Sequence, residues 1–200
     1  MTAAEVSAAV LAGGKSSRMG VDKALLEVDG VPMAQRVAQA LSAATNAEVL
    51  LIGGPASSAN LLGLAHAPDA IEGEGPLVGV WTAMSATAGD VIISACDLPF
   101  LNVATVSKFL EARCVSGDVA VAVVDGTLQQ SLARWNRRVF TRVAEAVESG
   151  ERSLRAVLAM VDVVEVQCER SALLNANRPS DLDAHHKGES DQTGNVRTIG

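Results

Sequence analysis

Aromatic residues are scarce in this chain: its 200 residues include two tryptophans, three phenylalanines and no tyrosine. Proteins that bind single-stranded nucleic acid commonly stack the bases on aromatic side chains, so the composition argues against such a platform. Positively charged residues are also in the minority: there are 16 lysines and arginines and 23 aspartates and glutamates, which gives a formal net charge of −7. We therefore expect neither nucleic acid nor a membrane surface as a partner. An anionic ligand requires positive charge that is concentrated locally.

Cysteine is equally sparse, with Cys96, Cys114 and Cys168 and no C-x-x-C pair. This odd number favours neither a disulfide framework nor a zinc site and is typical of a reducing compartment. No run of about 18 apolar residues occurs, so we expect no membrane span. The N-terminal stretch lacks the basic region of a signal peptide, and we expect a cytoplasmic protein.

Apolar segments alternate with amphipathic ones along the chain. Strands are predicted over 6–13, 47–54, 90–97, 118–126, 128–136 and 161–167, and helices over 32–44, 75–87, 103–113, 138–150 and 152–161. Alternating helices and apolar strands are typical of an α/β layer structure with a mostly parallel sheet. We expect one domain over 1–184 and a disordered polar tail over 185–200.

Ligands of such sheets bind at the carboxyl ends of the strands. Three predicted strands end at distinctive residues: the segment 13–23 follows the first, Gly53 and Gly54 follow the second, and Asp97 follows the third. Because parallel strands end at the same edge, we expect these residues to form one site.

The segment LAGGKSSRMGVDKALL (Leu11–Leu26) is rich in glycine and basic residues directly after the first strand. Two common phosphate-binding patterns do not fit it. The P-loop pattern G-x-x-x-x-G-K-[ST] requires glycine at position 9, which is Ala9. The dinucleotide pattern G-x-G-x-x-G does not match the spacing of Gly13, Gly14 and Gly20. A long open loop is the remaining interpretation.

This loop has the chemistry of a triphosphate cradle. Gly13 and Gly14 carry no side chain, so backbone amides there can approach phosphate oxygens closely. Lys15, Arg18 and Lys23 supply three positive charges. Together with one Mg²⁺ they match the roughly four negative charges of a nucleoside triphosphate.

The same segment resembles the L-A-G-G-x-x-x-R-M-G-x-D-K signature of nucleotidyltransferases with the Rossmann-like sugar-nucleotide pyrophosphorylase fold. Three later segments resemble further family elements in the same order, namely GPLVG (75–79), CDLPFL (96–101) and LLNANRPSDL (173–182). They correspond to a G-P-L-x-G turn, a metal-binding C-D-x-P-[FY] element and a C-terminal N-x-N-x-P-x-D-L element. The combination resembles the molybdenum cofactor guanylyltransferase family and implies a three-layer α/β fold with a mostly parallel sheet.

The resemblance implies a reaction in which GTP and a molybdopterin-type cofactor give the guanine dinucleotide cofactor and pyrophosphate. The terminal phosphate of the pterin would attack the α-phosphorus of GTP. No covalent enzyme nucleophile is needed, and the sequence has no Ser/His/Asp or Cys/His arrangement that would provide one. The implied partners are GTP, the molybdopterin-type cofactor and, transiently, proteins that make or accept that cofactor.

Asp97 is the candidate Mg²⁺ ligand, because it ends an apolar strand before a proline-containing turn and Mg²⁺ favours one or two carboxylates with phosphate oxygens and water. The resemblance assigns Lys23 to the nucleotide phosphates and Lys15 and Arg18 to the departing pyrophosphate. The implied catalytic residues are Arg18, Lys23 and Asp97. The further implied nucleotide contacts are Leu11, Ala12, Gly13, Gly14 and Asp69, and the implied pterin contacts are Asn175 and Asn177.

Two departures from the family pattern leave alternatives open. Some relatives have an asparagine after the second strand that helps to recognise guanine, whereas Gly53 and Gly54 stand here. Cytidylyl transfer from CTP to the same acceptor, and a non-catalytic nucleotide-binding module, therefore stay open. Near Gln129–Ser131 the family often has a proline after a polar residue, so the pterin contacts of that region stay open as well.

Overall fold

The computed structural model describes residues 6–13, 22–71, 74–112 and 117–176. Its central sheet has seven strands in the order β5-β4-β1-β6-β8-β7-β9. The strands are β1 (Ser7–Leu11), β4 (Val49–Ile52), β5 (Ala65–Ala67), β6 (Val91–Ala95), β7 (Val119–Val124), β8 (Thr127–Trp135) and β9 (Val163–Gln167). All neighbouring pairs are parallel except those of β8, which runs antiparallel to both β6 and β7. The predicted mostly parallel sheet is confirmed.

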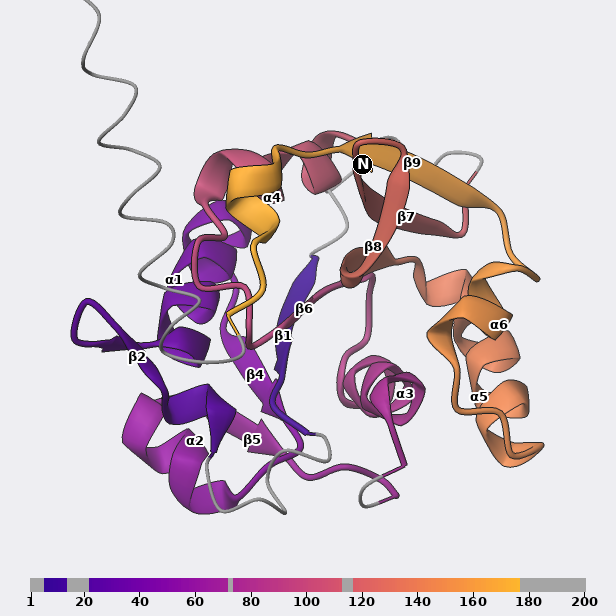
Figure 1. Ribbon diagram of the computed structural model, residues 1–200. Coiled ribbons are helices and arrows are strands. Elements are labelled where there is room, and N and C mark those ends of the chain that lie inside the picture. The colour runs from indigo at the N-terminus through magenta and orange to yellow at the C-terminus, as the bar shows by residue number, and fades with distance from the viewer. Residues whose placement is uncertain (1–5, 14–21, 72–73, 113–116, 177–200) are drawn as a thin grey trace, which may run out of the picture.

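Helices cover both faces of this sheet (Figure 1). One layer contains α1 (Met33–Thr45), α2 (Ala56–Leu62) and α4 (Val103–Glu111), and the other contains α3 (Pro76–Ala86), α5 (Phe140–Glu148) and α6 (Leu154–Leu158). Side chains of β1 alternate between the two cores: Ala8 and Val10 pack on the α1 side, and Ala9 packs on the α3 side. This period of two is the pattern of a strand that is buried on both faces. The predicted three-layer α/β fold is confirmed.

Local sequence explains where the helices near the site begin and end. α1 is followed by the cap residue Asn46, which has the left-handed φ of 56° that suits a helix C-terminus. α3 follows Gly75, whose φ of 94° is accessible to glycine, and Pro76 occupies its first turn, where a missing N–H costs nothing. The helices predicted over 32–44 and 75–87 are therefore α1 and α3.

The structure corrects the expectation of strict helix–strand alternation. β7 and β8 are consecutive strands joined by Asp125 and Gly126, whose φ values are 49° and 74°. Asp-Gly with two positive φ angles forms the tight hairpin turn that reverses the chain, which makes β8 antiparallel. Not predicted from the sequence were α2, β5 and a small hairpin of β2 (Glu27–Val28) and β3 (Val31–Pro32).

Two other expectations concern the domain limit and membrane spans. Residues 177–200, which include the predicted tail, lie outside the described residues, so the domain limit at 184 stays a prediction. None of the described helices is long and apolar enough to cross a membrane.

Candidate active site

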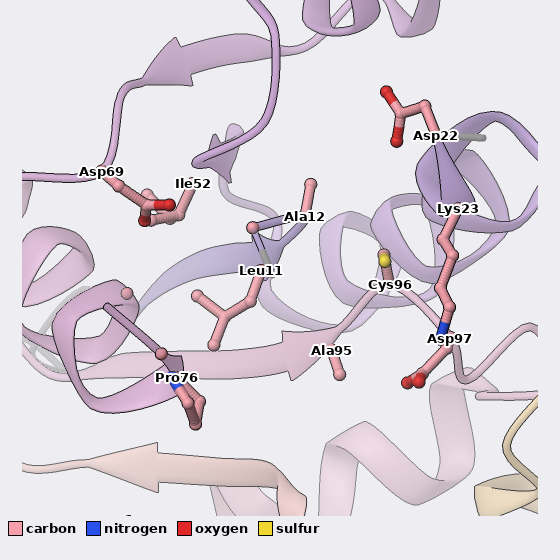
Figure 2. A pocket seen from close by; sticks show the side chains of 13 residues that line it. Leu11, Ala12, Asp22, Lys23, Ile52, Asp69, Pro76, Ala95, Cys96 and Asp97 are labelled. Atoms are coloured by element: carbon pink, nitrogen blue, oxygen red, sulfur yellow. The ribbon is translucent and has the colours of Figure 1, made fainter. Parts of the chain in front are cut away.

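A cavity lies at the carboxyl ends of β1, β4 and β6, where the sequence predicts the site (Figure 2). Its lining includes Leu11, Ala12 and Gly13 after β1, the turn that carries Lys23, the loop that carries Asp69, and Asp97 after β6. These predicted residues come from separate parts of the sequence and meet at one edge of the sheet. The ends of β1, β4 and β6 thus meet at one cavity, whereas the role of these residues as a site stays a prediction, and residues 14–21 lie outside the described residues.

Asp97 lies two residues beyond β6, and its Oδ1 atom is buried without a hydrogen-bond partner in the described part of the chain. Burial raises the pKa of the Asp97 carboxyl, and the positive charge of Lys23 and a backbone hydrogen bond oppose that rise. A buried polar atom without a partner costs free energy, so it calls for a ligand. A carboxylate oxygen in this state fits a magnesium ion, whose remaining ligands would be phosphate oxygens and water.

Lys23 and Asp97 both line the cavity, and the charge of Lys23 acts on the Asp97 carboxylate. Lys23 begins η2, a short 3-10 helix (Lys23–Leu25) that is anchored by the fully buried Ala24. Figure 2 shows the Lys23 side chain extending from this turn toward the Asp97 carboxylate. The lysine therefore combines two possible effects: it favours the ionised form of Asp97, and its ammonium group can attract a phosphate.

The structure brings Asp69 into the site, between the loops that follow β1 and β4. A Cβ atom added at Gly13 or at Gly53 would lie 2.5 Å from Asp69 Oδ2. Both positions therefore need glycine for the carboxylate to stay in place. Gly53 also has a φ of 70°, and its carbonyl oxygen lies 3.3 Å from His66 Nε2 on β5. The space that a side chain at position 53 would enter is thus taken by Asp69.

The first turn of α3 lines the cavity as well, through Gly75, Pro76 and Gly79. No side chain of the described residues caps the start of this helix, and the positive end of its dipole can attract an anionic ligand. Gly79 allows α3 to approach β1 closely, because a Cβ atom there would lie 3.1 Å from Leu11 Cδ2. The sequence predicted a helix over 75–87, and the resemblance to the family's G-P-L-x-G turn was what linked its start to the site.

The C-terminal element contacts the strand end that carries Asp97. The backbone N–H of Ala176 donates a hydrogen bond to the Asp97 carbonyl oxygen at 3.0 Å, which places the exposed Asn175 next to the site. The other predicted contacts, Gly14, Lys15, Arg18 and Asn177, lie outside the described residues. Their roles stay predictions.

Two further residues of the lining, Asp22 and Cys96, had no predicted role. Burial, followed by the charges of Asp97 and Asp22, raises the pKa of the Cys96 thiol to about 12. The thiol therefore stays protonated at neutral pH, so Cys96 is a buried structural residue rather than a nucleophile. No group of three or more His, Cys, Asp or Glu side chains gathers within the described ranges to hold a metal.

A mostly parallel, doubly covered α/β sheet with a cavity at the carboxyl ends of its strands is the arrangement of the Rossmann-like class of proteins. The match to known families is more specific. Residues 8–168 match the model of the MobA-like NTP transferase domain, and the chain belongs to this family of nucleotidyltransferases.

Individual relatives agree with this assignment. One from Pelotomaculum thermopropionicum, named "Probable molybdenum cofactor guanylyltransferase", is 33% identical over 202 residues, covering 96% of this chain and 98% of the relative. One from Rhizobium rhizogenes, named "Molybdenum cofactor guanylyltransferase", is 32% identical and covers 90% of both chains. The crystal structure of molybdopterin-guanine dinucleotide biosynthesis protein A from Archaeoglobus fulgidus matches the fold with a TM-score of 0.73 at 20% identity, covering 93% of this chain and 100% of that one.

Proposed function

We propose that this chain transfers the GMP moiety of GTP to a molybdopterin-type cofactor and releases pyrophosphate. An oxygen of the acceptor's terminal phosphate forms a bond to the α-phosphorus, and the bond from that phosphorus to the β-phosphate oxygen breaks. The observation that carries the proposal is the buried Oδ1 of Asp97, which has no hydrogen-bond partner among the described residues and lies near Lys23 at the sheet edge of a MobA-like domain. The names of the relatives support the choice of nucleotide and acceptor.

The described residues divide the work of binding two anions. Lys23 and the N-terminus of α3 offset the negative charge of the phosphates, which otherwise repel each other. Asp69 suits the base, because a carboxylate accepts hydrogen bonds and the Watson–Crick edge of guanine presents two adjacent N–H donors. Asn175 lies where an acceptor would approach Asp97, and its amide can pair with the donors and acceptors of a pterin.

Asp97 would hold Mg²⁺, since its Oδ1 is buried and without a partner among the described residues. When bound, the ion would neutralise phosphate charge and stabilise the negative charge that develops during transfer. The chain's own groups then orient the two reactants and exclude competing water.

Pyrophosphate release by the purified protein tests the proposal, with Mg²⁺ and a molybdopterin-type cofactor present and each of the four nucleoside triphosphates offered separately. We expect release with GTP only. Faster release with CTP would change the product to a cytosine dinucleotide. Absence of release with all four nucleotides would contradict the proposed transfer.

A Gly53→Ala substitution tests the assigned nucleotide side of the cavity. The new Cβ would collide with the Asp69 carboxylate, so we expect GTP affinity to fall about tenfold, the scale of one hydrogen bond to a charged group. The φ of 70° adds a stability cost of about 1–2 kcal/mol. Titration calorimetry of GTP binding would measure the first effect, and denaturant unfolding would measure the second.

Gly63→Ala is the matched control for this prediction. Gly63 ends α2 with a φ of 66°, but nothing lies within 4 Å of a Cβ atom placed there. The positive φ should therefore destabilise Gly63→Ala to the same extent as Gly53→Ala, whereas its GTP affinity should stay unchanged. Equal GTP affinities for the Gly53→Ala and Gly63→Ala variants would show that Asp69 does not need its present place for nucleotide binding.

A further inference from the structure

Asp22 and Lys23 are adjacent in sequence, but their side chains leave the same turn in opposite directions. Figure 2 shows Lys23 extending toward Asp97 and Asp22 pointing away from it. Asp22 caps η2: its Oδ1 accepts a hydrogen bond from the backbone N–H of Ala24 at 3.0 Å. Its Oδ2 accepts a hydrogen bond from Ser58 Oγ on α2 at 2.5 Å. Both carboxylate oxygens therefore hold the turn from which Lys23 extends.

The Ser58 hydroxyl bonds outside its own helix, unlike the two hydroxyls of α3. In α3, Thr82 and Ser85 each donate to the carbonyl oxygen four residues earlier in the same helix. The corresponding acceptor for Ser58 is the carbonyl oxygen of Gly54, which His66 Nε2 approaches at 3.3 Å. The Ser58 hydroxyl instead donates across 36 residues of sequence to Asp22. Since Ser58 is only 3% exposed, water is a poor substitute for this partner.

The turn that carries Lys23 needs such an anchor. η2 has three residues, and an isolated turn of this length is not stable on its own. Ala24 supplies one attachment, through its buried methyl group, and the Asp22–Ser58 hydrogen bond supplies the other. A lysine side chain has several rotatable bonds, so its ammonium group is placed reproducibly only when its backbone is fixed.

We infer that Ser58, through Asp22, is a positioning residue that holds Lys23 opposite Asp97 for the transfer reaction. The inference rests on the proposed function, because the value of a fixed Lys23 lies in that chemistry. It also links two sides of the site: α2 begins directly after the Gly53–Gly54 loop, on the side assigned to the base, whereas Lys23 serves the phosphates.

Four variants separate positioning from general stability. Ser58→Ala removes the donor, and we expect kcat to fall about tenfold, since small misplacements of a catalytic group cost between tenfold and a hundredfold. Asp22→Ala should have a similar effect. Asp22→Asn should retain most of the activity, because its amide can still accept from Ala24 and can donate to Ser58 Oγ. Ser57→Ala, the exposed neighbour in the same helix, is the matched control and should leave kcat unchanged.

A double-mutant cycle with Lys23→Ala provides the decisive kinetic readout. If Ser58 acts through Lys23, Ser58→Ala should lower kcat in the wild-type background and leave the residual kcat of the Lys23→Ala enzyme unchanged. An equal loss in both backgrounds would overturn the inference, because the effect would then be general. An unchanged kcat for Ser58→Ala in the wild-type background would overturn it as well.

Hydrogen exchange of the Ala24–Leu26 amides provides a readout that needs no activity. These amides bond within the turn, to Asp22 and Lys23, so Ser58→Ala should make them exchange faster and Ser57→Ala should not. Wild-type protein that releases no pyrophosphate would overturn the proposed function, and the exchange rates would still test the anchor. Unchanged exchange in Ser58→Ala would overturn the anchor itself.

Discussion

Replacing Asp97 by asparagine should lower turnover by about 10²–10³-fold, the scale of losing one key electrostatic group in an active site. The substitution keeps the size and packing of the side chain but removes the negative charge that a magnesium ion requires. Pyrophosphate release at saturating GTP and Mg²⁺ would measure the effect. Asp125→Asn is the control, because Asp125 is an exposed aspartate of the β7–β8 turn that pairs with Arg170. Near-normal turnover by Asp97→Asn would refute the metal role of Asp97.

The same variant should not be less stable than the wild type at neutral pH without metal. Burial raises the folded-state pKa of Asp97 above its ordinary value of 3.8, so the folded protein holds this proton more tightly than the unfolded chain. The contribution of this proton to the free energy of unfolding is fully present below pH 3.8 and is lost as the pH rises through the folded-state pKa. Because asparagine does not ionise, the free energy of unfolding of the variant does not decrease in this way. Denaturant unfolding in a chelator at several pH values would check this, and a less stable Asp97→Asn at neutral pH would contradict it.

The sequence predicted the parts of the site that depend on local pattern. Gly13 and Asp97 directly follow short apolar segments, and parallel strands end at the same edge, so their meeting could be inferred without coordinates. The glycines after β4 were identified in the same way. What could not be inferred was why glycine stands at position 53, since the reason is the Asp69 carboxylate from another loop.

Weak local signals account for the elements that were missed. β5 has the sequence Ala-His-Ala, with none of the β-branched or aromatic residues that mark a strand, and it forms because it pairs with β4. α2 is seven residues long and consists largely of small and polar side chains. The reversal at Asp125–Gly126 did have a sequence signal, since Asp-Gly between apolar segments is typical of a hairpin, but the apparent alternation of helices and strands concealed it.

The hydrogen bond between Asp22 and Ser58 could not be predicted for a different reason. Each residue has an ordinary local explanation, Asp22 as a cap and Ser58 as a small helical residue. Their hydrogen bond spans 36 positions and depends on how α2 packs beside η2, which no periodicity encodes. Local pattern and the family resemblance thus located the candidate groups of the site, and tertiary packing determined how they are held.

Replacing Lys23 by methionine should lower turnover by about 10²-fold, because it removes a charge-assisted contact to phosphate in a site where electrostatic stabilisation dominates. It should also change the pH dependence. Lys23 lowers the pKa of Asp97 against the effect of burial, so without Lys23 that pKa rises further. Since ionised Asp97 is the form that binds the metal, the acid limb of the pH–rate profile should move to higher pH.

Pyrophosphate release by the Lys23→Met and wild-type enzymes across the pH range would measure both effects. Lys108→Met is the control: Lys108 lies on α4 and donates to the Gln167 carbonyl oxygen at 3.1 Å at the surface, so its loss should change neither turnover nor the acid limb. An acid limb that stays in place in Lys23→Met, with turnover reduced, would assign Lys23 to the phosphates alone. An acid limb that moves to lower pH would contradict the electrostatic coupling between Lys23 and Asp97, because loss of a neighbouring positive charge can only make a carboxylate harder to ionise.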